Sequence, residues 1–133
     1  MLTPMSLGTV CLVVACVLPI ACAGLAKRGG LANRSYDNSA PRAWLARQEG
    51  AAGRANAAQQ NSWEALSIFG PAVLTAQLGH APTALVDGLA LVFLVSRLVY
   101  IGLYVGDLAT ARSAVWTLGF VASIALFFTP IWG

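Results

Sequence analysis

The chain has 133 residues, of which 58% are hydrophobic and 10% are charged, with a formal net charge of +3. Soluble domains carry about 25% charged residues, so this composition cannot cover a surface that faces water and excludes an ordinary soluble enzyme. The length allows one domain over residues 1–133, and the composition predicts an all-α membrane protein.

The first predicted membrane span covers residues 5–26, because a spanning helix needs about 20 mostly apolar residues. No Lys or Arg precedes it. A signal peptide carries positive charge ahead of its apolar core, so we expect a retained membrane helix. Cys11, Cys16 and Cys22 are five and six residues apart. They therefore lie on different helical faces and predict small buried side chains rather than a metal site or a disulfide.

The segment 27–57 carries most of the positive charge. A basic cluster would also suit nucleic acid, but this one lies between two apolar segments. That position favours a cytoplasmic loop under the positive-inside rule, with no nucleic-acid partner. Glycines, asparagines and Pro41 predict a loop over 27–41, followed by a helix that begins near Arg42 in water, with an irregularity at 50–53. Six of the eight basic residues lie in the segment: Lys27, Arg28, Arg34, Arg42, Arg47 and Arg54.

Three further spans are predicted at 58–79, 83–105 and 112–132. Short links join them, so neighbouring helices should run antiparallel and form a transmembrane four-helix bundle. A cytoplasmic basic loop then places both termini on the non-cytoplasmic side. The prediction is a multi-pass integral membrane protein, in the inner membrane if bacterial. Asp87 is expected to be interfacial or to contact a neighbouring helix.

Polar residues recur at helical spacing. Arg54 and Asn61 are seven residues apart, and Glu64 follows three later, so they share one stripe of the second span. In the third span, Arg97, Tyr100 and Tyr104 occur at i, i+3 and i+7, again on one face.

Charges inside a membrane helix cost about 2.5–3.5 kcal/mol each on insertion scales, so these residues should face protein or water. One interpretation is an internal Arg97–Glu64 ion pair that fixes helix packing. The other is a polar ligand site at the cytoplasmic end of the bundle. Arg54, Arg97 and Arg112 outnumber Glu64, and this excess of positive charge favours a site for an anion.

The chain resembles the MAPEG family, the membrane-associated proteins in eicosanoid and glutathione metabolism, and looks most like its bacterial branch. The resemblance covers nearly the whole chain. Its most specific part is the Asn-x-x-Glu of the second span combined with the Arg-Ser that opens the fourth. The matching residues are Tyr36-Asp-Asn38, Pro41-Arg42-Ala-Trp44-Leu45, Arg54-Ala55, Gln60-Asn61-Ser-Trp-Glu64-Ala65, Arg97-Leu98, Tyr100, Tyr104, Arg112-Ser113 and Trp116.

The resemblance implies a homotrimer of four-span protomers, with glutathione bound between neighbouring protomers near the cytoplasmic side. Asn61 and Glu64 match positions that hold glutathione in the family's enzymes, and Arg97 and Tyr104 match binding positions in the third helix. Arg112 matches the arginine assigned to thiolate activation, and Ser113 follows it as in the prostaglandin E synthase member.

The residues agree with this chemistry. Glutathione offers two carboxylates, which suit Arg54, Arg97 and Arg112, and one ammonium, which suits Glu64 with Asn61. Tyr100 shares the face of Arg97 and is a further candidate binding residue. Arginine and a helix N-terminus both lower a thiol pKa. The thiolate could then attack an electrophile dissolved in the membrane lipid, or reduce a lipid peroxide.

Two departures from the family pattern leave catalysis open. Several animal members have Arg where this chain has Ala57, and often Tyr where it has Trp116. The family also includes a non-enzymatic member, the five-lipoxygenase-activating protein. The alternative prediction is therefore a non-catalytic lipid-binding adaptor or an accessory subunit of a larger complex.

Overall fold

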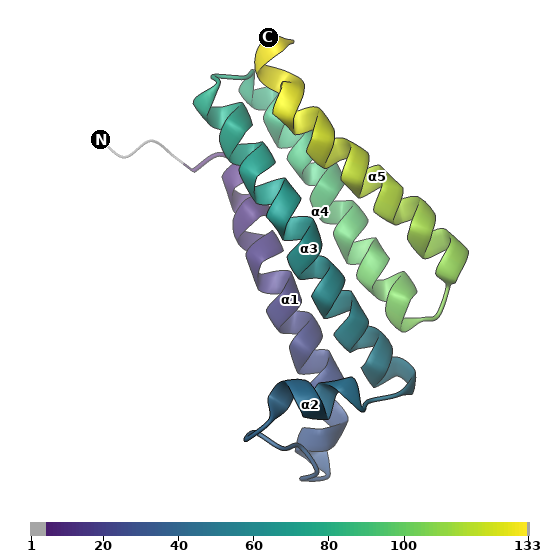
Figure 1. Cartoon of the computed structure of the whole chain (residues 1–133). Helices are drawn as coiled ribbons and strands as arrows, with labels where there is room; N and C mark the ends of the chain where they lie inside the picture. Colours follow the sequence, from purple (N-terminus) through teal and green to yellow (C-terminus); the bar gives the residue numbers. More distant parts are fainter. Residues whose placement is uncertain (1–4, 133) are drawn as a thin grey trace.

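A computed structural model describes residues 5–132, and this part of the chain contains only helices and the turns between them. The bundle is built from four long helices, with both ends of the described chain at one end of the bundle and the short helix α2 at the other (Figure 1). The elements are α1 (Leu7–Ala32), α2 (Pro41–Ala46), α3 (Gly50–Leu78), α4 (Thr83–Val105), α5 (Ala109–Phe128) and the 3-10 turn η1 (Thr129–Ile131).

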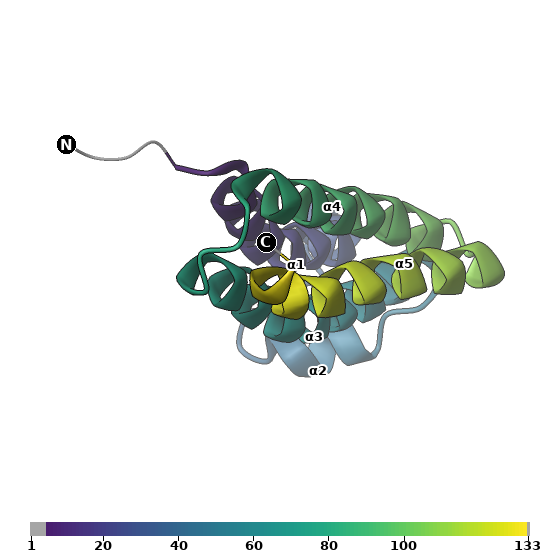
Figure 2. The ribbon, with the colours of Figure 1, turned by 90° about the horizontal axis from the view of Figure 1, so that it is seen from above.

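Three of the long helices in the described chain are long and apolar enough to cross a membrane: Leu7–Ala32, Thr83–Val105 and Ala109–Ile131. The second predicted span, 58–79, lies in α3, which has the length but begins with the polar stretch 54–61. Helices α3 and α4 pack on each other and on both α1 and α5 (Figures 1 and 2). Large aliphatic side chains such as Val17, Val95 and Val121 are exposed on the outside, as expected of helices that face lipid.

The centre of the bundle is an aromatic stack surrounded by small residues. The rings of Phe69 and Phe93 lie parallel, with centroids 3.8 Å apart. Ala72 and Ala76 of α3 belong to the same core cluster and are fully buried. Small side chains let membrane helices approach closely, so α3 can pack against three neighbours.

The loop predicted over 27–41 is shorter than expected, because α1 continues to Ala32 and includes both glycines of that segment. Gly30 is needed for packing rather than for a turn. A Cβ at this position would lie 2.2 Å from Trp44 Cζ2. The Trp44 ring is held by its Nε1, which donates to the carbonyl of Ser35 at 2.9 Å. Glycine here lets α2 fold back against α1.

The second helix also differs from the prediction. A separate helix, α2, starts at Pro41, and the break falls at Arg47–Glu49, just before the 50–53 segment where it was expected. Residues 50–57, placed in the cytoplasmic loop 27–57, form the first two turns of α3. Gly50 has φ +59, a left-handed conformation that favours glycine. A Cβ on Gly53 would lie 2.6 Å from the carbonyl oxygen of Gln48, so the sharp turn needs glycine there too.

The exposed turn before α2 is ordered by Asp37. Its carboxylate accepts hydrogen bonds from the hydroxyl and the backbone N–H of Ser39. These bonds hold the pKa of Asp37 below its ordinary value, and the bond from the Ser39 hydroxyl has the larger effect.

At the opposite end, Asp87 contacts a neighbouring helix, one of its two expected roles. Its Oδ1 accepts from the backbone N–H of Gly8 at 2.7 Å, in the first turn of α1. An anion stabilises a helix N-terminus, so Asp87 fixes α1 against α4. Gln77 Nε2 donates to Ser6 Oγ and Thr9 Oγ1 at 3.1 and 2.9 Å.

Substituting Gly30 by alanine should destabilise the protein, whereas the same change at Gly29 should not. Overpacking of this kind costs about 1–3 kcal/mol, because the new methyl group would displace the Trp44 ring. A Cβ on Gly29 meets nothing within 4 Å. Thermal unfolding of the two detergent-solubilised variants measures the difference. Equal melting temperatures would contradict the proposed Gly30–Trp44 packing.

Candidate functional site

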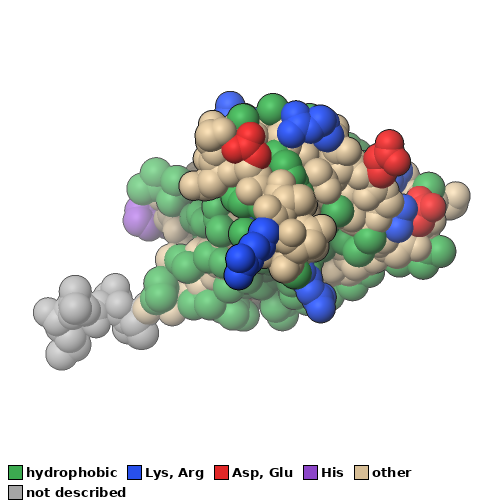
Figure 3. All heavy atoms as spheres, turned by 90° about the horizontal axis from the view of Figure 1, so that it is seen from below, with side chains coloured by type: hydrophobic (Ala, Val, Ile, Leu, Met, Phe, Trp, Pro, Cys, Tyr) green, Lys and Arg blue, Asp and Glu red, His purple; other side chains and the backbone are tan. Residues whose placement is uncertain are grey.

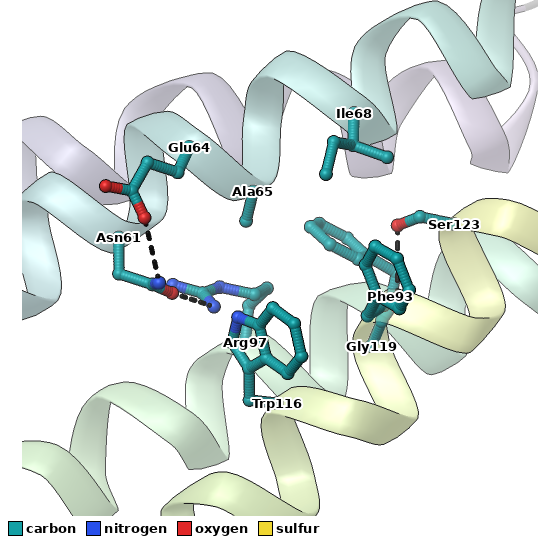
Figure 4. A pocket seen from close by; sticks show the side chains of 10 residues that line it. Asn61, Glu64, Ala65, Ile68, Phe93, Arg97, Trp116, Gly119 and Ser123 are labelled. Atoms are coloured by element: carbon teal, nitrogen blue, oxygen red, sulfur yellow. Dashed lines mark hydrogen bonds between the residues drawn. The ribbon is translucent and has the colours of Figure 1, made fainter.

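A small pocket opens between α3, α4 and α5, and it brings together several of the predicted site residues (Figure 4). Its polar side is formed by Asn61, Glu64 and Arg97, and its apolar side by aromatic and small residues. Its volume is about 50 Å³. The lining residues are Asn61, Glu64, Ala65, Ile68, Phe93, Arg97, Trp116, Gly119, Phe120 and Ser123.

Arg97 forms the floor of the polar side and is only 3% exposed. Its Nη1 donates to Asn61 Oδ1 at 2.8 Å, and its Nη2 donates to Ser62 Oγ at 3.0 Å. Asn61 Nδ2 in turn donates to Glu64 Oε2 at 3.2 Å. Arg97 therefore reaches Glu64 through Asn61 (Figure 4), in place of the direct ion pair considered from the sequence.

Aromatic rings connect this network to Arg112. The Arg97 guanidinium lies 4.1 Å from the Tyr100 ring centroid. Tyr100 and Tyr104 meet edge to face, with centroids 5.6 Å apart, and the Arg112 guanidinium lies 4.2 Å from the Tyr104 centroid. Each cation–π contact contributes about 0.5–2 kcal/mol. A continuous series of contacts therefore runs from Arg112 on α5 across α4 to Glu64 on α3.

Arg54 is not a lining residue of the pocket. Its Nε donates to the carbonyl oxygen of Val105 at 3.0 Å, at the last residue of α4. Cations stabilise helix C-termini, so Arg54 fastens α3 to the end of α4, close to Tyr104.

Ser113 lies in the second turn of α5, and its hydroxyl is exposed and donates to the carbonyl oxygen of Ala109 at 3.1 Å. Arg112 precedes it and is partly exposed. Both residues lie near the positive end of the α5 dipole, which favours an anion.

Sequence reasoning did not assign three contributors to the site, although it named one of them, Trp116, in the comparison with the family pattern. Ser62 accepts from Arg97 and is buried beside Asn61. Trp116 and Phe120 stack in parallel at 5.2 Å. The signal for these two rings was present in the sequence, because residues 112, 116 and 120 lie four apart on one face of α5.

The arrangement offers an anion site with an apolar wall. Glu64 supplies an exposed carboxylate, and the aromatic pair supplies apolar surface. Arg112 does not line the pocket, but it supplies partly exposed positive charge that is linked to the pocket through Tyr104, Tyr100 and Arg97. Ligand pockets usually enclose about 300–1,000 Å³, so this cavity encloses only part of a tripeptide-sized ligand. No group of three or more His, Cys, Asp or Glu residues that could hold a metal occurs within residues 5–132.

Comparison with protein-family models matches residues 7–132 to one described as the MAPEG family. No curated protein and no solved structure matches the chain.

Proposed function

The chain belongs to the MAPEG family, and from this premise we propose that it is a glutathione-dependent transferase or peroxidase that acts on lipophilic electrophiles. Family membership and the three apolar helices make it a multi-pass membrane protein. The observation that carries the proposed activity is the series of contacts that joins Arg112 on α5, outside the pocket lining, through α4 to Glu64 in the lining.

In this proposal Glu64, oriented by Asn61, binds the ammonium of glutathione. Arg112 faces the sulfur and stabilises the thiolate. Arg97 already donates hydrogen bonds to Asn61 and Ser62. It therefore positions Asn61 and adds positive charge behind the carboxylates of glutathione. Tyr100 and Tyr104 hold the two guanidinium groups, and Arg54 holds the end of α4 beside them.

The reaction would use the thiolate as nucleophile. In a transfer, sulfur forms a bond to the electrophilic carbon, and the leaving group departs with its electron pair. In a peroxidase reaction, sulfur attacks the terminal oxygen of a lipid hydroperoxide and forms a sulfenic acid. The O–O bond breaks, and the lipid alkoxide departs with the electron pair and takes a proton from water to become the alcohol. A second glutathione then reduces the sulfenic acid, giving the disulfide and water. Ser113, next to Arg112, would donate a hydrogen bond to the thiolate by turning its hydroxyl away from the Ala109 carbonyl. Trp116, which is 39% exposed, and Phe120 offer the electrophile an apolar approach from the lipid.

We further propose a homotrimer. A pocket of about 50 Å³ is too small for glutathione alone, and its lining residues Glu64 and Trp116 are exposed. A neighbouring protomer would cover these residues and complete the site. If α3 also crosses the membrane and the basic end is cytoplasmic, both termini lie on the non-cytoplasmic side, and the membrane is the inner membrane if the protein is bacterial. Figure 3 views the bundle from the α2 end, which is the basic end. It shows Lys, Arg, Asp and Glu side chains there, with hydrophobic side chains between and around them.

Glutathione should raise the melting temperature of the detergent-solubilised protein by several degrees. A ligand at one hundred times its Kd stabilises by about 2.7 kcal/mol. Cysteinylglycine is the matched control, because it keeps the thiol but lacks the γ-glutamyl carboxylate and places its ammonium differently. We expect a much smaller shift with it. Equal shifts with both thiols would contradict the assigned roles of Glu64 and the arginines, and no shift with either would contradict thiol binding.

The alternative proposal is a non-catalytic lipid-binding adaptor or accessory subunit. It is favoured by the engagement of Arg97 inside the protein and by the mostly apolar lining of the pocket. It predicts that the purified protein shows no thiol-dependent turnover. An activity assay with a generic electrophile and glutathione decides between the two proposals.

A further inference from the structure

The pocket between α3, α4 and α5 extends beyond the residues assigned to glutathione. On α3 its lining runs from Asn61 to Ile68, which is seven residues or about 10 Å along the helix axis. Asn61 and Glu64 form the polar end of the pocket (Figure 4). We call the opposite end the apolar recess, and its lining residues are Ile68, Phe93, Gly119, Phe120 and Ser123.

The apolar recess is narrow. Gly119 lets α5 approach α4 closely here, because a Cβ at this position would lie 2.6 Å from Ser96 Oγ. The ring of Phe93 is held in place by the fully buried Phe69, which stacks on it at 3.8 Å. The whole pocket encloses about 50 Å³, whereas a cavity that binds benzene measures about 150 Å³. The recess therefore lacks room for an aromatic ring but admits an extended chain.

The chemistry of the recess suits hydrocarbon. Ser123 carries its polar side chain, and this hydroxyl is buried and donates to the carbonyl oxygen of Gly119 at 3.0 Å. A polar group that entered the recess would exchange water for an apolar wall, which costs free energy. A methylene group that enters gains free energy by leaving water. The recess therefore favours an alkyl chain over a chain that ends in a polar group.

The recess also lies along α5 from the position proposed for the sulfur. Arg112, Trp116 and Phe120 are four residues apart on one face of α5, and the two rings stack at 5.2 Å. The axial distance from Arg112 to Trp116 is about 6 Å, and from Arg112 to Phe120 it is about 12 Å. Each carbon–carbon bond of an extended chain advances it by roughly 1.3 Å. A straight alkyl group on the sulfur therefore passes Trp116 after about five bonds and reaches Phe120 after about nine.

We propose that the apolar recess binds the far end of a straight alkyl chain, so that the protein selects straight-chain lipid electrophiles over aromatic and cyclic ones. The inference rests on the glutathione-dependent function proposed above, because the sulfur fixes the near end of the chain. In a transfer, sulfur forms its bond to the carbon at the near end, and the leaving group departs from that carbon with its electron pair. The far end stays in the recess.

Product analogues test this selection without turnover. S-butylglutathione, S-decylglutathione and S-(4-cyclohexylbutyl)glutathione are titrated calorimetrically into the full-length protein in lipid nanodiscs. The decyl compound should have a Kd about tenfold lower than the butyl compound, which corresponds to about two methylene groups leaving water. The cyclohexylbutyl compound has as many carbons as the decyl compound, but its ring is too wide for the recess. It should bind no tighter than the butyl compound.

Ala65→Val should remove the tenfold gain of the decyl compound. Ala65 lines the pocket between Glu64 and Ile68 (Figure 4), and two added methyl groups there would obstruct the way into the recess. The butyl chain is too short to reach Phe120, so its Kd should not change, and this also shows that the variant is folded. Ala84→Val changes an exposed alanine of α4 outside the lining. It is the matched control and should keep the full gain.

Three results would overturn the proposed selection while leaving glutathione binding intact. They are equal Kd values for the decyl and butyl compounds, a cyclohexylbutyl compound that binds as tightly as the decyl compound, and an unchanged gain in Ala65→Val. Equal weakening of the butyl and decyl compounds in Ala65→Val would also overturn it, because the recess would then not distinguish chain lengths. If neither glutathione nor any analogue binds, the proposed function itself fails, and the chain selection fails with it.

Discussion

Replacing Arg112 by alanine is expected to reduce glutathione conjugation by about 10²–10³-fold, the usual loss when one preorganised group that stabilises a developing or reacting anion is removed. The effect should fall on kcat more than on glutathione binding. Asn61 and Glu64 lie on α3 with Arg97 behind them, so the binding residues remain in place. The measurement is steady-state kinetics with a generic electrophile.

The pH dependence of the rate gives a second readout for Arg112. A free thiol has a pKa near 8.5, and a nearby arginine or helix N-terminus lowers it. The rate rises with pH as the thiolate forms, so the wild-type midpoint should lie below 8.5 and the Arg112→Ala midpoint should move up toward it. Arg28→Ala removes an exposed arginine from the basic end of the chain and should change neither quantity. Wild-type activity with an unmoved midpoint in Arg112→Ala would exclude the proposed mechanism.

The helices could be predicted where the signal is local. An apolar run, interrupted by Asp87 and Arg97 and bounded by His-Ala-Pro and Gly-Asp, predicted 83–105, and α4 covers these same residues. Glycine misled the prediction at the end of α1, because sequence alone reads Gly29 and Gly30 as breakers. Gly30 instead makes room for Trp44, fourteen residues away, and only the packing of α2 on α1 reveals it.

Part of the candidate site could also be predicted, because the spacing of its residues lies within single helices. Spacing placed Arg97, Tyr100 and Tyr104 on one face, and the structure adds their order of contact from Arg97 to Arg112. Spacing could not show that Arg54 binds the Val105 carbonyl, because that contact joins residues 51 positions apart. A count of charges predicted an excess of arginine, but which arginine remains accessible depends on the packing of neighbouring helices.

The strongest test of whether Arg97 is retained for function is Arg97→Met. The guanidinium is 3% exposed and reaches the nearest carboxylate only through Asn61. Its burial is therefore costly, and replacing buried charged groups by apolar residues of similar volume is often neutral or stabilises by about 1–4 kcal/mol. Ser62 keeps its hydrogen bond to the Ala58 carbonyl, and Asn61 is partly exposed to solvent. We expect Arg97→Met to melt at or above the wild-type temperature.

The same variant should lose most of the glutathione-induced thermal shift, because Asn61 is no longer oriented and the positive charge behind the carboxylates is gone. Arg54→Met is the matched comparison. It removes a cation from a helix C-terminus, which costs about 0.3–1 kcal/mol, so it should melt below the wild type while keeping more of the shift. Compared with the wild type, the melting temperature should therefore be equal or higher in Arg97→Met and lower in Arg54→Met. A large fall in the melting temperature of Arg97→Met, with the glutathione shift intact, would make Arg97 a structural residue and remove it from the site.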